Sequence, residues 1–286
     1  LAALLGPLPN LGAALRLGPL NLLRFAAVGL SSGAGLARRW FSGEPARRVL
    51  PGLALHVDLG PNDPFSAALG YMLGTMAATG GNAIPIGGAQ AITDALVTRL
   101  RAHGGSLRLG AEVNGITVEQ GRVRAVRLVS GEEIRVRRLV MANTDAAALF
   151  RRLLPRSTVP NRLYRSMERF PRGWGTFKMD WALDGPVPWR SDDARRSAVI
   201  HAGDSLADLV RFTAQVRQGA LPDNPYLVIG QQSLVDPSRA PDGGHTLWAY
   251  SRVPTNPEGG WTAQKARFAD RVEARIEGLA PGFRSQ

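Results

Sequence analysis

The stretch from Ile84 to Asp145 constrains the fold of this 286-residue chain more than any other part. It opens on the pattern Pro-x-Gly-Gly at 85–88, and apolar residues then recur at helical spacing from Ala89 to Leu100. Gly104-Gly105 is expected to end this helix, because glycine readily adopts the left-handed backbone found at helix C-termini. A strand pattern follows directly, so the stretch predicts an α/β unit.

Five strand patterns follow the helix. The first, at Leu107–Val113, is expected to join a buried sheet, and an antiparallel meander comes next. The meander strands are expected at 112–118, 122–129 and 133–136, with turns at Gln120-Gly121 and Ser130-Gly131. The unbroken apolar run at 139–142 then predicts a return to a sheet buried on both faces. The expected fold class is therefore α/β with mixed α+β character: a partial Rossmann-like dinucleotide-binding domain whose crossover is a three-stranded β-meander.

Composition is typical of a soluble globular protein, with 44% apolar and 20% charged residues. The absence of cysteine excludes disulfides, iron–sulfur clusters and thiolate zinc sites. His56, His103 and His201 share no metal-ligand spacing, so no metal site is expected. The net charge of +12 comes from scattered arginines rather than from a basic face with stacking aromatics, so no nucleic-acid partner is expected.

Two segments carry a family resemblance. The first comprises Pro85-x-Gly87-Gly88 and the later patterns Val113-x-x-Ile116 and Val140-x-Ala142-Asn143. The second runs from Asp236 to His245 and reads Asp-Pro-Ser-Arg-Ala-Pro-Asp-Gly-Gly-His. In this order they resemble FAD-dependent oxidoreductases of the phytoene desaturase and amine oxidase type, in particular the bacterial phytoene dehydrogenase-like branch.

The chain also departs from that family. Its members begin with a strand, a Gly-x-Gly-x-x-Gly turn and a helix, which together bind the FAD pyrophosphate. Here the nearest candidate is Gly33-Ala34-Gly35, and Arg38 stands where the third glycine would be. The family's C-terminal Gly-Gly segment is missing as well. We therefore expect an internal fragment that is inactive by itself and holds FAD weakly.

The resemblance implies three parts: a helical part of a substrate or cap domain at 1–83, a partial FAD-binding domain at 84–148, and a substrate domain of mixed sheet and helices at 149–286. Strands of the last part are expected at 175–183, 197–201, 226–234 and 246–253, and helices at 206–216 and 262–279. The implied activity is dehydrogenation or isomerisation of a lipophilic, polyene-like substrate by hydride transfer to FAD. The alternative is a non-catalytic lipid- or partner-binding module that keeps this fold.

Four residues are candidates for cofactor contact through the resemblance. The backbone of Val113 is expected to pair with the adenine edge of FAD, and Gly87 and Gly88 allow the backbone to approach the cofactor closely. Asn143 either contacts FAD or caps the helix that follows it. No catalytic residue is identified, since His245 suits either proton transfer or a plain loop, and Asp236 is expected to fix a turn.

The N-terminal stretch poses two further questions. Leu11–Leu30 is rich in leucine and alanine, but Arg16, Pro19 and Arg24 interrupt it, so a membrane-spanning helix is not expected. A cytoplasmic protein is expected, with a peripheral membrane contact left open. The pattern Gly-x-Ser-x-Gly at 29–33 matches the nucleophile elbow of hydrolases, but the residues before it look helical, whereas the elbow needs a strand there.

Overall fold

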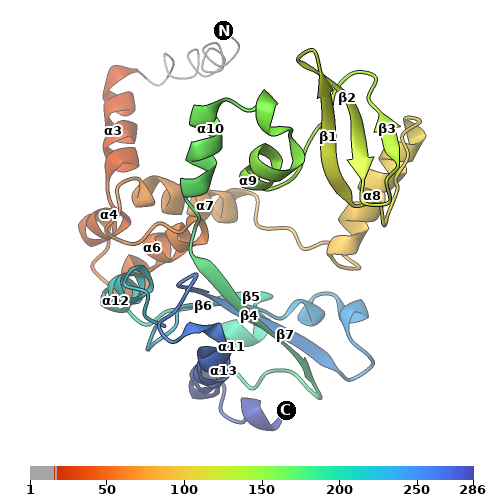
Figure 1. Ribbon diagram of the computed structural model, residues 1–286. Coiled ribbons are helices and arrows are strands. Elements are labelled where there is room, and N and C mark those ends of the chain that lie inside the picture. The colour runs from red at the N-terminus through yellow and green to blue at the C-terminus, as the bar shows by residue number, and fades with distance from the viewer. Residues whose placement is uncertain (1–15, 17) are drawn as a thin grey trace. The chain divides into compact units, whose positions relative to one another are not determined.

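The computed structural model describes residue 16 and residues 18–286, which form two compact units (Figure 1). The first unit combines the chain up to Ala91 with Trp174–Gln286, and the second is Ile92–Gly173. An α/β fold with antiparallel sheets is confirmed. The three parts expected from the resemblance, with boundaries at 83/84 and 148/149, are defined by function rather than by packing. These boundaries stay predictions.

Short helices make up the N-terminal part of the first unit. They are α3 (Pro19–Leu30), α4 (Gly33–Trp40), α5 (Glu44–Arg47), α6 (Val49–Ala54), η1 (Leu55–Val57) and α7 (Ser66–Thr79). Pro19 stands in the first turn of α3, where its missing N–H breaks no helical bond. Gly70 lets α7 approach α6, since a Cβ there would lie 2.2 Å from the carbonyl oxygen of Leu50. Because Gly29 and Leu30 are the last residues of helix α3, no strand leads into Ser31, and the nucleophile-elbow interpretation is excluded.

The rest of the first unit is built on a four-stranded sheet. Its strands are β4 (Gly175–Leu183), β5 (Val199–Ala202), β6 (Leu227–Gly230) and β7 (His245–Val253), in the order β4-β7-β6-β5. Every pairing is antiparallel, so the expectation of a mixed sheet was wrong in this respect. The helices are α11 (Asp192–Arg196), α12 (Leu206–Arg217) and α13 (Gly260–Leu279), with short helices η5 (Gln232–Leu234), η6 (Pro237–Arg239) and η7 (Phe283–Ser285).

Helix α13 covers one face of this sheet (Figure 1). Burial alternates along β4, which is the two-residue period of a strand with one covered face. The Phe177 ring stacks on Trp261 with centroids 5.6 Å apart and meets Phe268 edge-on at 5.1 Å. A second core, which includes Phe212 of α12 and Val228 of β6, lies away from this cluster.

The second unit contains the predicted meander. It consists of β1 (Val113–Glu119), β2 (Arg122–Leu128) and β3 (Glu133–Arg135), paired antiparallel in that order. Gln120 and Gly121 have φ angles of 48° and 73°, as a type I′ hairpin turn requires. The remaining elements are α8 (Ala89–Ala102), which crosses the boundary between the units, α9 (Ala146–Ala148), η2 (Leu149–Leu153), η3 (Arg156–Thr158), α10 (Asn161–Ser166) and η4 (Met167–Arg169).

Two predicted strands of the second unit do not form. Most of 107–113 and all of 139–142 are irregular, and the side chains of Leu109 and Met141 are 82% and 88% exposed. A buried strand needs a hydrogen-bonded neighbour, and the sheet of this unit contains only the three meander strands among the described residues. Helix α8 likewise buries none of its residues, so the predicted doubly covered sheet is wrong for the described chain.

Candidate functional site

Two of the patterns that carry the family resemblance, Pro-x-Gly-Gly at 85–88 and the loop after Asp236, meet in the first unit. The Gly87 N–H donates a hydrogen bond to Oδ2 of Asp236 at 2.8 Å, across 149 residues of sequence. Arg239 Nη2 donates to the carbonyl oxygen of Pro85 at 2.5 Å. The Pro-x-Gly-Gly turn and the loop after Asp236 therefore form one hydrogen-bonded site.

Asp236 is the centre of this network and is only 5% exposed. Its Oδ1 accepts the Ser238 hydroxyl at 2.6 Å, and its Oδ2 also accepts Nε of Arg239 at 2.9 Å. The Ser238 hydroxyl, the Arg239 guanidinium and the Gly87 N–H together lower the pKa of Asp236 to about 2. The contact with Ser238 belongs to the local turn that the sequence predicts at Asp236. No local sequence pattern predicts the contact with Gly87.

The backbone at Pro85–Gly88 forms a tight turn, closed by the Gly88 N–H on the Pro85 carbonyl at 3.2 Å. Gly87 is its third residue and has a φ of 78°, which is the type II geometry that requires glycine at this position. Gly88 has a φ of 88°, and no atom lies within 4 Å of the Cβ that another residue would carry there. Helix α8 begins at Ala89, so the two residues just before its N-terminus, Gly87 and Gly88, carry no Cβ, and the space beside Gly88 is open.

The other two candidates lie in the second unit. Val113 is the first residue of β1, opposite Leu128, rather than the last residue of a buried strand. Asn143 is exposed, and the helix N-cap is Asp145, whose side chain accepts the Ala148 N–H at 3.1 Å. The interpretation of Asn143 as the cap is therefore wrong. The contacts of Val113, Gly87, Gly88 and Asn143 with FAD stay predictions.

The sheet face opposite α13 carries a row of aromatic and basic side chains. The Trp248 ring lies over Gly230, where a Cβ would come within 2.2 Å of the indole, and its plane is 11° from that of Tyr250 at 5.9 Å. Trp248 Nε1 donates to Oε1 of Gln232 at 2.6 Å, which fixes the indole. This face thus presents a preorganised aromatic surface.

The same row ends in two histidines. The Tyr250 hydroxyl lies 3.1 Å from Nδ1 of His56, and Nε2 of His56 lies 3.2 Å from Nε2 of His201. Desolvation lowers the pKa of His56, and the Arg252 guanidinium lowers it further. Desolvation also lowers the pKa of His201 to about 4, with a contribution from His56. Both imidazoles are therefore neutral at pH 7, and one Nε2 donates to the other.

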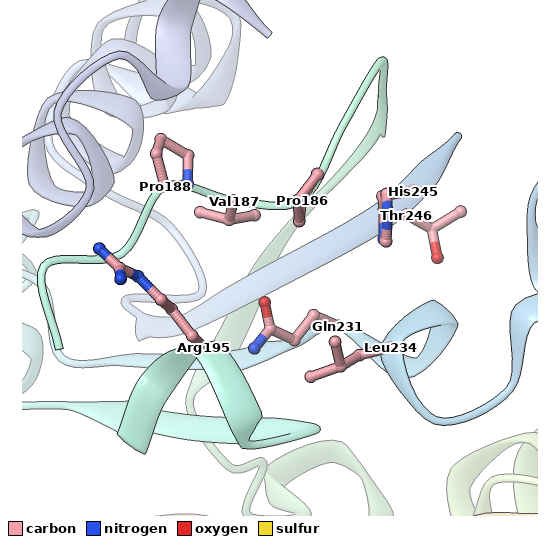
Figure 2. A pocket seen from close by; sticks show the side chains of 8 residues that line it. All are labelled: Pro186, Val187, Pro188, Arg195, Gln231, Leu234, His245 and Thr246. Atoms are coloured by element: carbon pink, nitrogen blue, oxygen red, sulfur yellow. The ribbon is translucent and has the colours of Figure 1, made fainter. Parts of the chain in front are cut away.

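A pocket of about 390 Å³ lies at the other end of the sheet (Figure 2). It is lined by Pro186, Val187, Pro188, Arg195, Gln231, Leu234, His245 and Thr246. Its polar groups are engaged by the fold: Gln231 Oε1 accepts from Nε1 of Trp189 at 3.0 Å, and Arg195 Nε donates to the Trp189 carbonyl at 2.6 Å. His245 Nδ1 lies 3.5 Å from the Ser233 hydroxyl.

Among the described residues, no three histidine, aspartate or glutamate side chains come close enough together to hold a metal ion. Within 18–286, no single helix has both the length and the apolar character needed to cross a membrane.

Comparison with known proteins now defines the class. The profile of the family described as flavin containing amine oxidoreductase matches residues 35–257, more than half of the chain. The chain belongs to this family. It is 29% identical over 246 residues to the phytoene desaturase (neurosporene-forming) of Cereibacter sphaeroides, covering 82% of this chain and 45% of that protein. The predicted resemblance to the phytoene desaturase-like branch is thereby confirmed.

One further protein and one solved structure are similar to this chain. Pyridine nucleotide-disulfide oxidoreductase domain-containing protein 2 of Rattus norvegicus is 28% identical over 264 residues, covering 86% of this chain and 45% of that protein. The crystal structure of an oxidoreductase from Methanosarcina mazei shares the fold, with a TM-score of 0.63 and 19% identity, over 88% of this chain and 53% of that one. The chain thus spans about half the length of these relatives.

The cofactor of this family is FAD. The described residues fit it in part, because Gly87 and Gly88 carry no Cβ and the space beside Gly88 is open, so that a ligand can approach the backbone there. Gly87 and Gly88 would contact FAD there. The sequence contains no Gly-x-Gly-x-x-Gly turn for the pyrophosphate.

Proposed function

We propose that this chain serves in an FAD-dependent oxidoreductase that dehydrogenates or isomerises a lipophilic substrate of the polyene class. Family membership and the phytoene desaturase relative support the proposal. The observation that carries it is the bond between Gly87 and Asp236, because it joins the two segments that resemble the family in sequence. When bound, FAD would accept hydride from the substrate.

The aromatic face of the sheet is the proposed substrate wall. Trp248 and Tyr250 are partly exposed, and the bond from Trp248 to Gln232 and the space over Gly230 hold the indole in place. Contact with these rings would stabilise a bound apolar polyene. Because the rings are already held in place, binding would not cost the entropy of immobilising them. We assign no catalytic side chain; the two histidines at this face, His56 and His201, bond to each other.

By itself the chain is proposed to be inactive. Helix α8 buries none of its residues, and apolar side chains such as Leu109 and Met141 are exposed in the second unit. Exposed apolar surface of this kind normally belongs to an interface or a core. The domain functions at 1–83, 84–148 and 149–286 remain part of this proposal.

The test compares the chain with the complete gene product. Flavin content would be measured by absorbance after purification, and turnover would be followed with phytoene as a polyene substrate. We expect the complete product to carry about one FAD and to convert the polyene, and the chain alone to do neither. A complete product without flavin would contradict the proposal and favour a binding module.

A membrane surface is the proposed partner of the N-terminal helices. The side chains of Leu20, Leu23 and Phe25 in α3 are 60%, 69% and 68% exposed. The first acidic residue of the whole sequence is Glu44, and it is preceded by Arg16, Arg24, Arg38 and Arg39. An exposed apolar helix with basic neighbours and no acidic ones suits the surface of an anionic bilayer.

A further inference from the structure

The loop after Asp236 holds the Pro85–Gly88 turn at two separate peptide groups. Asp236 Oδ2 accepts the N–H of the central peptide, between Ile86 and Gly87, at 2.8 Å. Arg239 Nη2 donates to the Pro85 carbonyl, which also accepts the N–H that closes the turn. We call Asp236 and Arg239 the clasp.

The first contact decides which way the central peptide points. Type I and type II turns differ by a flip of this peptide, and only glycine at the third position tolerates type II well. A carboxylate that accepts the Gly87 N–H stabilises one orientation, and the Ile86 carbonyl must then point away from Asp236. The observed φ of 78° at Gly87 matches the orientation that the clasp selects.

The second contact couples the turn to a charged pair. Arg239 Nε binds Asp236 at 2.9 Å, and the two side chains are only 22% and 5% exposed. Hydrogen bonds between charged partners are roughly twice as strong as neutral ones. The clasp is therefore a stiff support under a turn whose own residues, Gly87 and Gly88, have the freest backbone of any amino acid.

We propose that Asp236 and Arg239 are positioning residues for FAD, acting through the backbone of Gly87 and Gly88. This inference rests on the proposed function. Flexible glycines bind a ligand weakly unless something else orders them beforehand, and the clasp supplies that order. Without the carboxylate the central peptide can flip, and part of the binding free energy is then spent in restoring its orientation.

The experiment uses the complete gene product and five variants, of which Gly87→Ala disturbs the turn directly. Asp236→Ala removes the acceptor and the charge, Asp236→Asn keeps an acceptor for Gly87 but loses the charge, and Arg239→Lys keeps the charge but loses the fork. Asp242→Asn is the matched control, because Asp242 lies exposed in the same loop. The measurements are the FAD dissociation constant, the visible circular dichroism of bound flavin, the melting midpoint and hydrogen exchange of peptide 84–89.

We expect Asp236→Ala to weaken FAD binding about tenfold or more, the effect of losing one charged hydrogen bond. Its exchange at 84–89 should quicken and its flavin dichroism should change, while Asp236→Asn and Arg239→Lys fall between it and the wild type. Asp242→Asn should match the wild type. Gly87→Ala should reproduce the loss of affinity, because it disturbs the same turn directly.

Two results would overturn the inference. If Asp236→Ala folds, exchanges faster at 84–89 and still binds FAD with unchanged affinity and dichroism, the clasp serves stability alone. If Asp236→Ala does not fold, Asp236→Asn and Arg239→Lys, which disturb the network less, take its place. Faster exchange at 84–89 with unchanged FAD affinity and dichroism in these two variants would then overturn the inference. A wild-type product without affinity for FAD would overturn the proposed function together with this inference, so the two failures are distinguishable.

Discussion

Nε2 of His56 lies 3.2 Å from Nε2 of His201, although 145 residues separate them in the chain. One histidine belongs to a short helix and the other to the edge strand β5, so their bond ties the N-terminal helices to the sheet. Burial disfavours the charged form of both imidazoles, and the Arg252 guanidinium lies close to His56, so adding a proton to the neutral pair is unfavourable.

Acid should therefore weaken the fold through this pair. The pKa of each histidine is lower in the folded chain than the ordinary 6.5, so the unfolded chain binds protons first as the pH falls. The stability is complete above about pH 6.5 and decreases towards pH 4. We expect the melting midpoint of His201→Gln to fall less than that of the wild type over this pH range, by roughly 2 °C or more.

His103→Gln is the control for that measurement, because His103 is exposed and lies outside the pair. Its profile should follow the wild type. A His201→Gln variant whose midpoint falls as steeply as the wild type between pH 6.5 and pH 4 would show that the pair does not titrate with unfolding.

Gly230→Ala should displace Trp248. The added Cβ would lie 2.2 Å from the indole, which must then leave its place over the strand. Overpacking of this kind costs about 1–3 kcal/mol, and the emission of Trp248 should change with it. Gly278→Ala in α13 is the control, because nothing lies within 4 Å of its added Cβ, and it should leave stability equal or slightly higher. Unfolding in urea measures the stability of both variants. Equal stabilities of Gly230→Ala and Gly278→Ala would refute the packing argument.

Leu23→Glu combined with Phe25→Glu should reduce binding to anionic vesicles about tenfold or more, because the two most exposed apolar side chains of α3 become acidic. Cosedimentation with vesicles of mixed phosphatidylcholine and phosphatidylserine measures this. Val129→Glu is the control: it replaces an apolar side chain outside α3 that is 59% exposed. This variant should bind the vesicles as the wild type does. Equal loss in both variants would mean that net charge, rather than α3, determines binding.

Asn143→Ala tests the remaining role of Asn143. Since Asp145 caps the helix and also pairs with Arg172 at 2.7 Å, Asn143→Ala should leave the melting midpoint unchanged, whereas Asp145→Ala should lower it. In the complete gene product, Asn143→Ala should weaken FAD retention if the predicted contact exists. Unchanged FAD affinity, measured by flavin fluorescence, would remove Asn143 from the site.

Much of the fold was predictable from local patterns. The limits of β4 were predicted without error, and the meander and the long helices were placed to within a few residues. The reason is that strand and helix periods, turn glycines and helix ends depend on neighbouring residues along the chain. The buried strands at 107–113 and 139–142 were predicted wrongly, since an apolar run shows that a segment can be buried but not whether a partner strand is beside it.

The sequence by itself determined the family, the cofactor class and the Pro-x-Gly-Gly turn as a candidate site, because short motifs and glycine geometry are local properties. Only the tertiary structure decided that Asp236 reaches Gly87, and that His56 meets His201. Such contacts join residues that are more than a hundred positions apart, and the packing of the sheet and helices, rather than any spacing in the chain, brings them within hydrogen-bonding distance.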